Sequence, residues 1–119
     1  MQTIGTHIIL DGYEVQADFD QLDVSDFLEF VRSRIRSSDM TILGENFYDF
    51  ENPKGAFTYM ILLGESHFSI HTFPEEQKIT CDIYSCNISR DFSGEMRACM
   101  DGIVEYLKIG DPRITELAR

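Results

Sequence analysis

The sequence predicts an α+β fold, a two-layer α/β sandwich in which two helices pack on one face of a mainly antiparallel sheet. Two segments repeat apolar residues at helical spacing, and the other apolar segments are short enough to be strands. Two of the short segments flank a brief polar loop, as in an antiparallel hairpin. The chain has 119 residues without a repeat or linker, so residues 1–119 are expected to form a single domain.

The first apolar segment, residues 4–15, is interpreted as a strand, a turn at Asp11 and Gly12, and a returning extension. The acidic loop after it ends at Asp23, which can cap a helix. Arginines at positions 32, 34 and 36 lie where the C-terminal end of the helix dipole favours cations. The helix itself is predicted from apolar residues that share one face: Val24, Phe27, Leu28, Val31 and Ile35.

Residues 41–50 are predicted to form the next strand, with Gly44 as its weak point, and residues 51–55 are predicted to form a turn. Residues 56–63 are almost all apolar or aromatic. A strand with so little alternation is expected in the centre of the sheet, covered on both faces.

Two strand-like segments within residues 68–86 flank a polar loop and are predicted to pair as an antiparallel hairpin. Opposite residues of such a pair share a face, and two registers satisfy this condition. One register sets Cys86 opposite His67, and the other sets it opposite Glu65. Both put the thiol beside the bond between Glu65 and Ser66.

The second helix is predicted to begin after a cap at Asp91 or Ser93 and to end at Gly110 and Pro112. Residues 114–117 are expected to add a short edge strand. The apolar residues of this helix recur at helical spacing: Met96, Cys99, Met100, Ile103 and Leu107. Because both helices are expected on one side of the sheet, the other face is expected to be partly polar.

The formal net charge of −11, with no basic cluster, argues against nucleic-acid binding and against binding to anionic membranes. The first residues lack the basic region of a signal peptide, and no apolar run is long enough to span a bilayer. Three cysteines form no disulfide pattern, which favours free thiols and a reducing compartment. We therefore expect a cytoplasmic protein.

Ser66 is a candidate nucleophile, and His71 is taken as the nearest candidate along the sequence for activating it. Strand alternation would point these two side chains to opposite faces unless the chain bends near Ser66, which Gly64 would ease. Taken alone, the pair is better explained by an exposed serine and a hydrogen-bonded histidine.

A zinc site was weighed because four residues of the right types occur close together in the sequence: His67, His71, Cys81 and Cys86. Alternation points Cys81 to the opposite face from the other three, and no Cys-x-x-Cys spacing occurs. We therefore expect no metal.

Three motifs follow one another along the chain: Glu65-Ser66-His67, His71-Thr72-Phe73-Pro74-Glu75 and Cys81-Asp82-Ile83-Tyr84-Ser85-Cys86. Together they resemble the self-processing segment of the prokaryotic pyruvoyl-dependent S-adenosylmethionine decarboxylase family. The usual run there is Glu-Ser-His, His-Thr-Trp-Pro-Glu and a later Asp-aromatic-Thr-Cys-Gly. Weaker similarity extends to Phe50, Pro53, Gly55, Thr58 and, near the start, Gly5 and His7.

The resemblance implies self-cleavage between Glu65 and Ser66 into a β chain, residues 1–65, and an α chain, residues 66–119. Ser66 would attack the carbonyl of Glu65 to form an ester. β-Elimination and hydrolysis would then leave a pyruvoyl cofactor at position 66. In the family, the residues that match His71 and Thr58 assist this processing.

The resemblance also implies the roles of the mature site. The pyruvoyl group would form a Schiff base with the substrate amine and accept electrons as carbon dioxide leaves. Cys86 would return a proton, Phe50 would stack on the adenine, and Glu75 would bind the ribose, with His67 also counted among the substrate-binding residues. The product, decarboxylated S-adenosylmethionine, would serve spermidine and other polyamine synthesis, and the enzyme is expected to be a homodimer with sites at the interface.

Four departures from the family pattern touch the substrate side more than the processing bond: Phe73 replaces Trp, Asn87 replaces Gly, Thr58 replaces Ser, and one extra residue lies between Gly55 and Thr58. Two alternatives therefore stay open. One is a pyruvoyl-dependent arginine or ornithine decarboxylase on the same scaffold. The other is a homologue that does not process itself and acts in dimerisation or binding.

Overall fold

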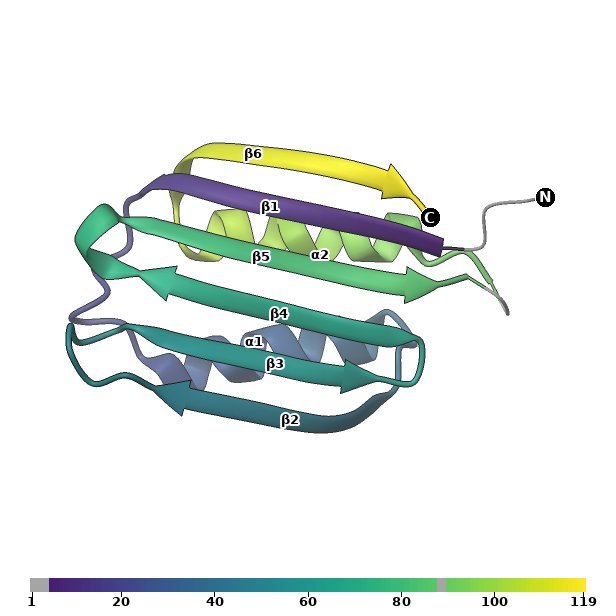
Figure 1. Cartoon of the computed structure of the whole chain (residues 1–119), viewed down its shortest axis with the longest axis horizontal. Coiled ribbons are helices and arrows are strands. Elements are labelled where there is room, and N and C mark those ends of the chain that lie inside the picture. The colour runs from purple at the N-terminus through teal and green to yellow at the C-terminus, as the bar shows by residue number, and fades with distance from the viewer. Residues whose placement is uncertain (1–4, 88–89) are drawn as a thin grey trace.

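The computed structural model describes residues 5–87 and 90–119 and confirms the predicted fold class, with six strands in one antiparallel sheet and two helices (Figure 1). The strand order is β2-β3-β4-β5-β1-β6. In chain order the elements are β1 (Gly5–Val15), α1 (Val24–Ser37), β2 (Ile42–Asp49), β3 (Phe57–Leu63), β4 (Ser66–Phe73), the short 3-10 helix η1 (Pro74–Glu76), β5 (Lys78–Cys86), α2 (Ser93–Tyr106) and β6 (Ile109–Ala118).

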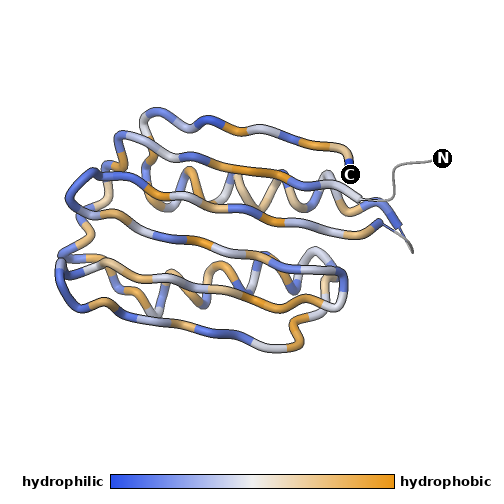
Figure 2. The backbone as a smooth tube through the Cα atoms, in the orientation of Figure 1, coloured by the Kyte–Doolittle hydropathy of each residue, from blue (hydrophilic) through white to orange (hydrophobic). Residues whose placement is uncertain are grey.

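Both helices lie on the same side of the sheet, with α1 behind β3 and β4 and α2 behind β5 and β1 in Figure 1. One face of every inner strand packs against them, so apolar and polar residues alternate along the strands in Figure 2. Neither helix, among the described residues, has the length and apolar character to span a bilayer. The side chains that fill the core between the layers include Ile8, Leu10, Phe27, Val31, Ile35, Phe68, Ile70, Ile83, Met96, Met100 and Ile103.

The predicted boundaries of α1 are confirmed. Asp23 precedes the helix and its carboxylate accepts a hydrogen bond from the Asp26 amide at 3.0 Å. The four apolar residues expected on the inner face after Val24 are all buried. The predicted second strand is also confirmed as β2, and the expected weak point is a shift of register between Ile42 and Gly44.

The predicted turn at Asp11 and Gly12 is wrong, because β1 continues through both residues to Val15. A glycine at position 12 is explained by packing instead. A Cβ atom there would come within 2.8 Å of Ile109 and 2.9 Å of Ile79, so the absence of a side chain lets two isoleucines close over the strand. The whole strand then pairs with β5 on one side and β6 on the other.

The prediction that residues 56–63 are covered on both faces is also wrong for this chain. β3 lies second in the sheet, and its residues alternate between buried and exposed positions. Met60 is 46% exposed and Leu62 is 58% exposed on the face that carries no helix. We call this the open face of the sheet.

The second helix is shorter than predicted and the last strand is longer. α2 ends at Tyr106, and both Gly110 and Pro112 lie inside β6. β6 is the expected edge strand, and as an edge strand it can hold a proline without losing a ladder hydrogen bond. The Asp91 carboxylate accepts from the Ser93 amide at 2.8 Å, although Phe92 occupies the position directly before the helix.

A polar contact joins α1 to the edge of the sheet. The buried Tyr59 on β3 donates its hydroxyl hydrogen bond to Glu45 on β2, and Arg32 on α1 donates to the same carboxylate at 2.7 Å. The hydrogen bond from Tyr59 lowers the pKa of Glu45, and the Arg32 guanidinium adds to this effect. Burial raises the pKa of Tyr59.

Tyr59→Phe is expected to lower the free energy of unfolding by roughly 1 to 2 kcal/mol at pH 7, because a hydrogen bond to a carboxylate is lost. Glu45 has a lowered pKa in the folded chain, so its contribution is complete above its unfolded pKa of about 4.3 and is lost as the pH falls through the lower value. Urea unfolding between pH 7 and pH 3 measures this.

Tyr48→Phe is the control, since the Tyr48 side chain is 63% exposed and its change should stay within about 0.5 kcal/mol. An equal loss for Tyr59→Phe at pH 7 and at pH 3 would show that the Glu45 contact does not stabilise the fold.

Candidate active site

The register of β4 against β5 is the second of the two that the sequence allows. Phe73 pairs with Lys78, and Ser66 pairs with Ser85. One step further along the ladder, the Cys86 amide donates a hydrogen bond to the Glu65 carbonyl at 2.9 Å. The predicted position of Cys86 beside the Glu65–Ser66 bond is therefore confirmed.

The turn between β3 and β4 is held on its other side by Thr41. The Gly64 amide donates to the Thr41 carbonyl at 2.8 Å, and the Thr41 amide donates to the Glu65 carboxylate at 2.9 Å. Two independent groups thus hold Glu65, the Thr41 amide at its side chain and the Cys86 amide at its carbonyl. The peptide bond that precedes Ser66 is consequently fixed in place before any chemistry begins.

Thr58 and His71 form a second group, halfway along the sheet. They are direct partners across β3 and β4, and the Thr58 hydroxyl lies 2.9 Å from His71 Nδ1. Both side chains are half-buried and lie on the open face. The structure therefore brings together the two residues that the resemblance links to processing.

His71 and Ser66 do not meet within one chain. The β4–β5 ladder runs from Ser66 to Phe73 without a bulge, so the bend that would bring them together is absent. His71 stands five positions beyond Ser66, which corresponds to roughly 16 Å along a strand.

A cluster on the open face next to Ser66 includes His67, which was predicted as a substrate-binding residue, but the sequence did not predict the cluster as a whole. His67 Nε2 lies 3.1 Å from Asp82 Oδ2, and His7 Nε2 lies 2.7 Å from the same oxygen. Ser69 donates its hydroxyl hydrogen bond to the other carboxylate oxygen. His67 Nδ1 faces the Ser66 hydroxyl at 3.3 Å. His7, Ser69, Asp82 and His67 therefore form one hydrogen-bond network, and His67 connects it to Ser66.

The pKa of Asp82 reflects this network. Burial acts to raise the pKa, but the hydrogen bonds from Ser69, His7 and His67 outweigh it and hold the pKa below the usual aspartate range. Alternation had already put Asp82 on the same face as His67. The arrival of His7 from β1 had no sequence signal, because it depends on which strand pairs with the far side of β5.

The residues weighed as zinc ligands are not gathered into one cluster. Cys81 is buried on the helix side, and His71 pairs with Thr58. Among the described residues, the group whose ligand atoms lie within 4.8 Å of one another is His7, His67 and Asp82.

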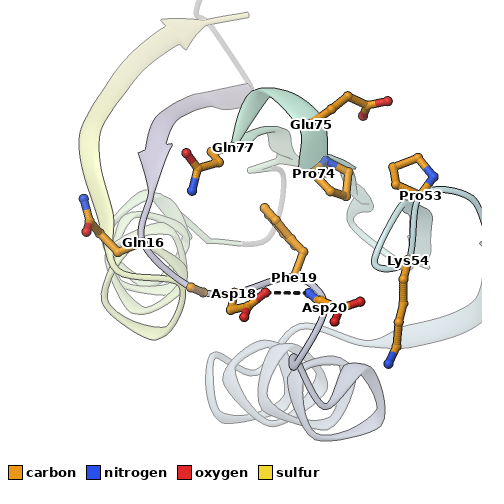
Figure 3. A pocket seen from close by; sticks show the side chains of 10 residues that line it. Gln16, Asp18, Phe19, Asp20, Pro53, Lys54, Pro74, Glu75 and Gln77 are labelled. Carbon is orange, nitrogen blue, oxygen red and sulfur yellow. Dashed lines mark hydrogen bonds between the residues drawn. The ribbon is translucent and has the colours of Figure 1, made fainter.

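The residues expected to bind a nucleoside lie at the other end of the strands from Ser66. Phe50 directly follows β2 and is 55% exposed, and Glu75 lies in η1 with its side chain exposed. Glu75 borders a cavity of about 400 Å³ in which Phe19 lies between two loops (Figure 3). Acidic side chains at Asp18 and Asp20 line the same cavity. On a single chain these residues and Ser66 therefore lie at opposite ends of the strands.

Comparisons with known proteins agree with the motifs and the fold. Residues 6–119 match the S-adenosylmethionine decarboxylase family. S-adenosylmethionine decarboxylase proenzymes from Hydrogenobaculum and Aquifex aeolicus are each 40% identical over 89% of this chain, which covers 74% and 73% of their lengths. Proenzyme 2 of Bacillus anthracis is 37% identical over 98% of this chain and 89% of its own.

The fold has a solved counterpart. The crystal structure of adenosylmethionine decarboxylase from Aquifex aeolicus superposes with a TM-score of 0.80 at 31% identity, over 100% of this chain and 92% of that one. The match of motif, sequence and fold extends over nearly the whole chain. The protein thus belongs to the S-adenosylmethionine decarboxylase family.

Proposed function

We propose that this chain is the proenzyme of a pyruvoyl-dependent S-adenosylmethionine decarboxylase that cleaves itself between Glu65 and Ser66. The observation that carries the proposal is the Cys86 amide bonded to the Glu65 carbonyl, next to the Ser66 hydroxyl. A donor in that position polarises the carbonyl and can stabilise the negative charge that develops on its oxygen during attack. The proenzyme names of the relatives support the same maturation.

Maturation would proceed in three steps. The Ser66 hydroxyl attacks the Glu65 carbonyl, so that a C–O bond forms, the peptide C–N bond breaks, and an ester with a free amino group results. In β-elimination, residue 66 then loses its α-hydrogen, and the ester C–O bond at its Cβ breaks. The main-chain carboxylate of Glu65 leaves as the new end of the chain of residues 1–65, and residue 66 becomes an enamine. Its imine form takes up water and releases ammonia, leaving a pyruvoyl group on the chain of residues 66–119.

The surroundings of position 66 fit such a group. Ser85 stands directly opposite, and its buried hydroxyl has no hydrogen-bond partner among the described residues, so it can donate to a carbonyl formed there. When present, the pyruvoyl ketone supplies an electron sink for decarboxylation. Cys86, half-buried beside the same bond, is the residue to which we assign the return of a proton to the substrate carbon.

Phe50 and Glu75 are assigned to the nucleoside of the substrate, the first for stacking on adenine and the second for bonding the ribose hydroxyls. Both are exposed and available to a ligand on the single chain. The product would feed polyamine synthesis. A cytoplasmic location is part of the proposal and is supported by the three free cysteines, Cys81, Cys86 and Cys99.

A homodimer would reconcile the two separated groups of site residues. The open face carries Thr58 and His71 in one region and Cys86 at one end, and it also exposes Met60 and Leu62. A second copy packed on this face around a two-fold axis would cover those apolar side chains. It would also bring the Ser66 end of one chain toward His71 of the other.

The first test is the intact mass of the purified protein under denaturing conditions. The wild type is expected to give two fragments, residues 1–65 and 66–119, with a pyruvoyl group at the start of the second. Ser66→Ala removes the nucleophile and is expected to give one full-length chain. A wild type that stays uncut after long incubation would instead favour the binding homologue.

The second test is the substrate. Glu75→Gln is expected to lower kcat/KM for S-adenosylmethionine about 10- to 100-fold, because a charge-assisted hydrogen bond to the ribose is lost. Release of labelled carbon dioxide from the carboxyl-labelled substrate measures this. Glu76→Gln, the neighbouring exposed acid of η1, is the control and should leave the rate within about twofold. Faster release from arginine or ornithine would identify a basic amino acid decarboxylase.

The third test asks whether two chains share one site. Ser66→Ala and His71→Ala chains are each expected to stay largely uncut alone. When the two are refolded together, the His71→Ala chain is expected to be cut in mixed dimers, because the Ser66→Ala chain supplies His71. Fragments are followed on a denaturing gel with one chain tagged. No cutting in the mixture, with mixed dimers present, would contradict a shared site.

A further inference from the structure

A chain of hydrogen bonds leads from Ser66 through His67 to Asp82. The Ser66 hydroxyl lies 3.3 Å from His67 Nδ1, and the opposite ring nitrogen of His67 lies 3.1 Å from Asp82 Oδ2. The three residues come from one protomer, on the neighbouring strands β4 and β5. A hydroxyl, an imidazole and a carboxylate in this order are the parts of a nucleophile with its base and the group that orients the base.

The partners of the two histidines fix where the ring protons lie. Arg119 has only donors, and its guanidinium lies 3.0 Å from His7 Nδ1, so that nitrogen accepts. His7 Nε2 then carries the hydrogen and donates to Asp82. Because the lowered pKa of Asp82 keeps it ionised, His67 Nε2 must donate to it as well. In the neutral ring, this leaves the lone pair of His67 Nδ1 facing the Ser66 hydroxyl.

The same partners argue that the cluster is a proton relay and not a metal centre. A histidine that binds a metal usually donates its second ring N–H to a carboxylate or carbonyl. Here Arg119, which has only donors, faces the outer nitrogen of His7, and the Ser66 hydroxyl faces that of His67. Neither group is a carboxylate or a carbonyl, so the arrangement suits ring hydrogens that are directed at Asp82.

We infer that His67, oriented by Asp82, is the general base and acid for the first step of self-cleavage, an inference that rests on the proposed self-processing. His67 Nδ1 takes the proton from Ser66 Oγ as the C–O bond to the Glu65 carbonyl carbon forms. Asp82 stabilises the imidazolium. His67 then gives the proton to the nitrogen of residue 66 as the C–N bond breaks, so the ring ends neutral and atoms and charge balance.

His71 of the same chain cannot perform this step. It lies roughly 16 Å along the strand from Ser66, and its Nδ1 is engaged with Thr58. With this separation, His71 can act only in a later step of processing or on the Ser66 of a second copy of the chain. His67 by contrast is adjacent to the nucleophile in every copy of the chain, so the first step needs no partner.

The test follows the rate at which freshly synthesised, radiolabelled full-length chain converts into its two fragments in a cell-free system. His67→Ala is expected to slow this conversion about 10²- to 10⁴-fold, which is the usual contribution of a general base. Added imidazole should restore part of the rate, since the His67 side chain is 40% exposed and its place can be refilled. Circular dichroism verifies that the variant is folded.

Hydroxylamine, which cleaves esters much faster than amides, identifies the step. The His67→Ala chain should stay intact in hydroxylamine, because the ester never forms. His7→Gln removes the other imidazole on Asp82 without touching Ser66 and should slow conversion less than tenfold. Asp82→Asn should slow it more than tenfold, with partial recovery in Asp82→Glu, and its uncut chain should also resist hydroxylamine.

The outcomes separate this inference from the proposed function. If the wild type is not cut, both fail. If the wild type is cut and His67→Ala is cut at a similar rate, only the role of His67 is overturned. Hydroxylamine cleavage of an accumulated His67→Ala ester would also overturn it, since His67 would then act after the acyl shift. Slow conversion that imidazole does not raise in the folded His67→Ala chain would mark His67 as structural and likewise overturn the role.

Discussion

The register of β4 against β5 is the constraint on which the rest of the molecule depends. Side chains alternate with a period of two, so a slip of β4 by one residue would move Phe68 and Ile70 from the core to the open face. The buried apolar residues therefore exclude such a slip, and the observed register is one of the two that keep them in the core. The same ladder continues one step past Ser66 and sets the Cys86 amide on the Glu65 carbonyl. The register that packs the core thus also sets the contacts at the proposed cleavage bond.

Because the helices cover only one face of the sheet, the open face carries both polar and apolar side chains. Two helices bury one face, and on the other side the strands present a polar region around His7, Asp82 and His71 beside exposed Met60 and Leu62. In the proposed homodimer, a second chain on the open face would bury those apolar residues while leaving the polar groups paired with one another.

Local patterns in the sequence predicted local structure well. The apolar stripe and Asp23 predicted α1, and strand parity predicted both the hairpin and the closeness of Cys86 to the cleavage bond. The predictions that failed depended on contacts between residues far apart in the sequence. Gly12 looked like a turn residue, but it lies within a long strand because Ile79 and Ile109 need its space. His7 could not be assigned to the site either, since nothing within residues 5–15 states that β1 pairs with β5.

The network around Asp82 also explains why cleavage should be confined to one serine. Ser69 donates to Asp82, whose pKa is held below the usual aspartate range by its hydrogen bonds, so this carboxylate is a weaker base than an ordinary aspartate. Ser85 is buried and lacks a partner among the described residues, so no base faces its hydroxyl. Ser66 differs from both, because the His67 ring lies 3.3 Å from its hydroxyl and a backbone amide donates to the carbonyl before it. In the proposed self-cleavage, the reactivity of Ser66 would arise from these two hydrogen bonds, which meet at one peptide bond.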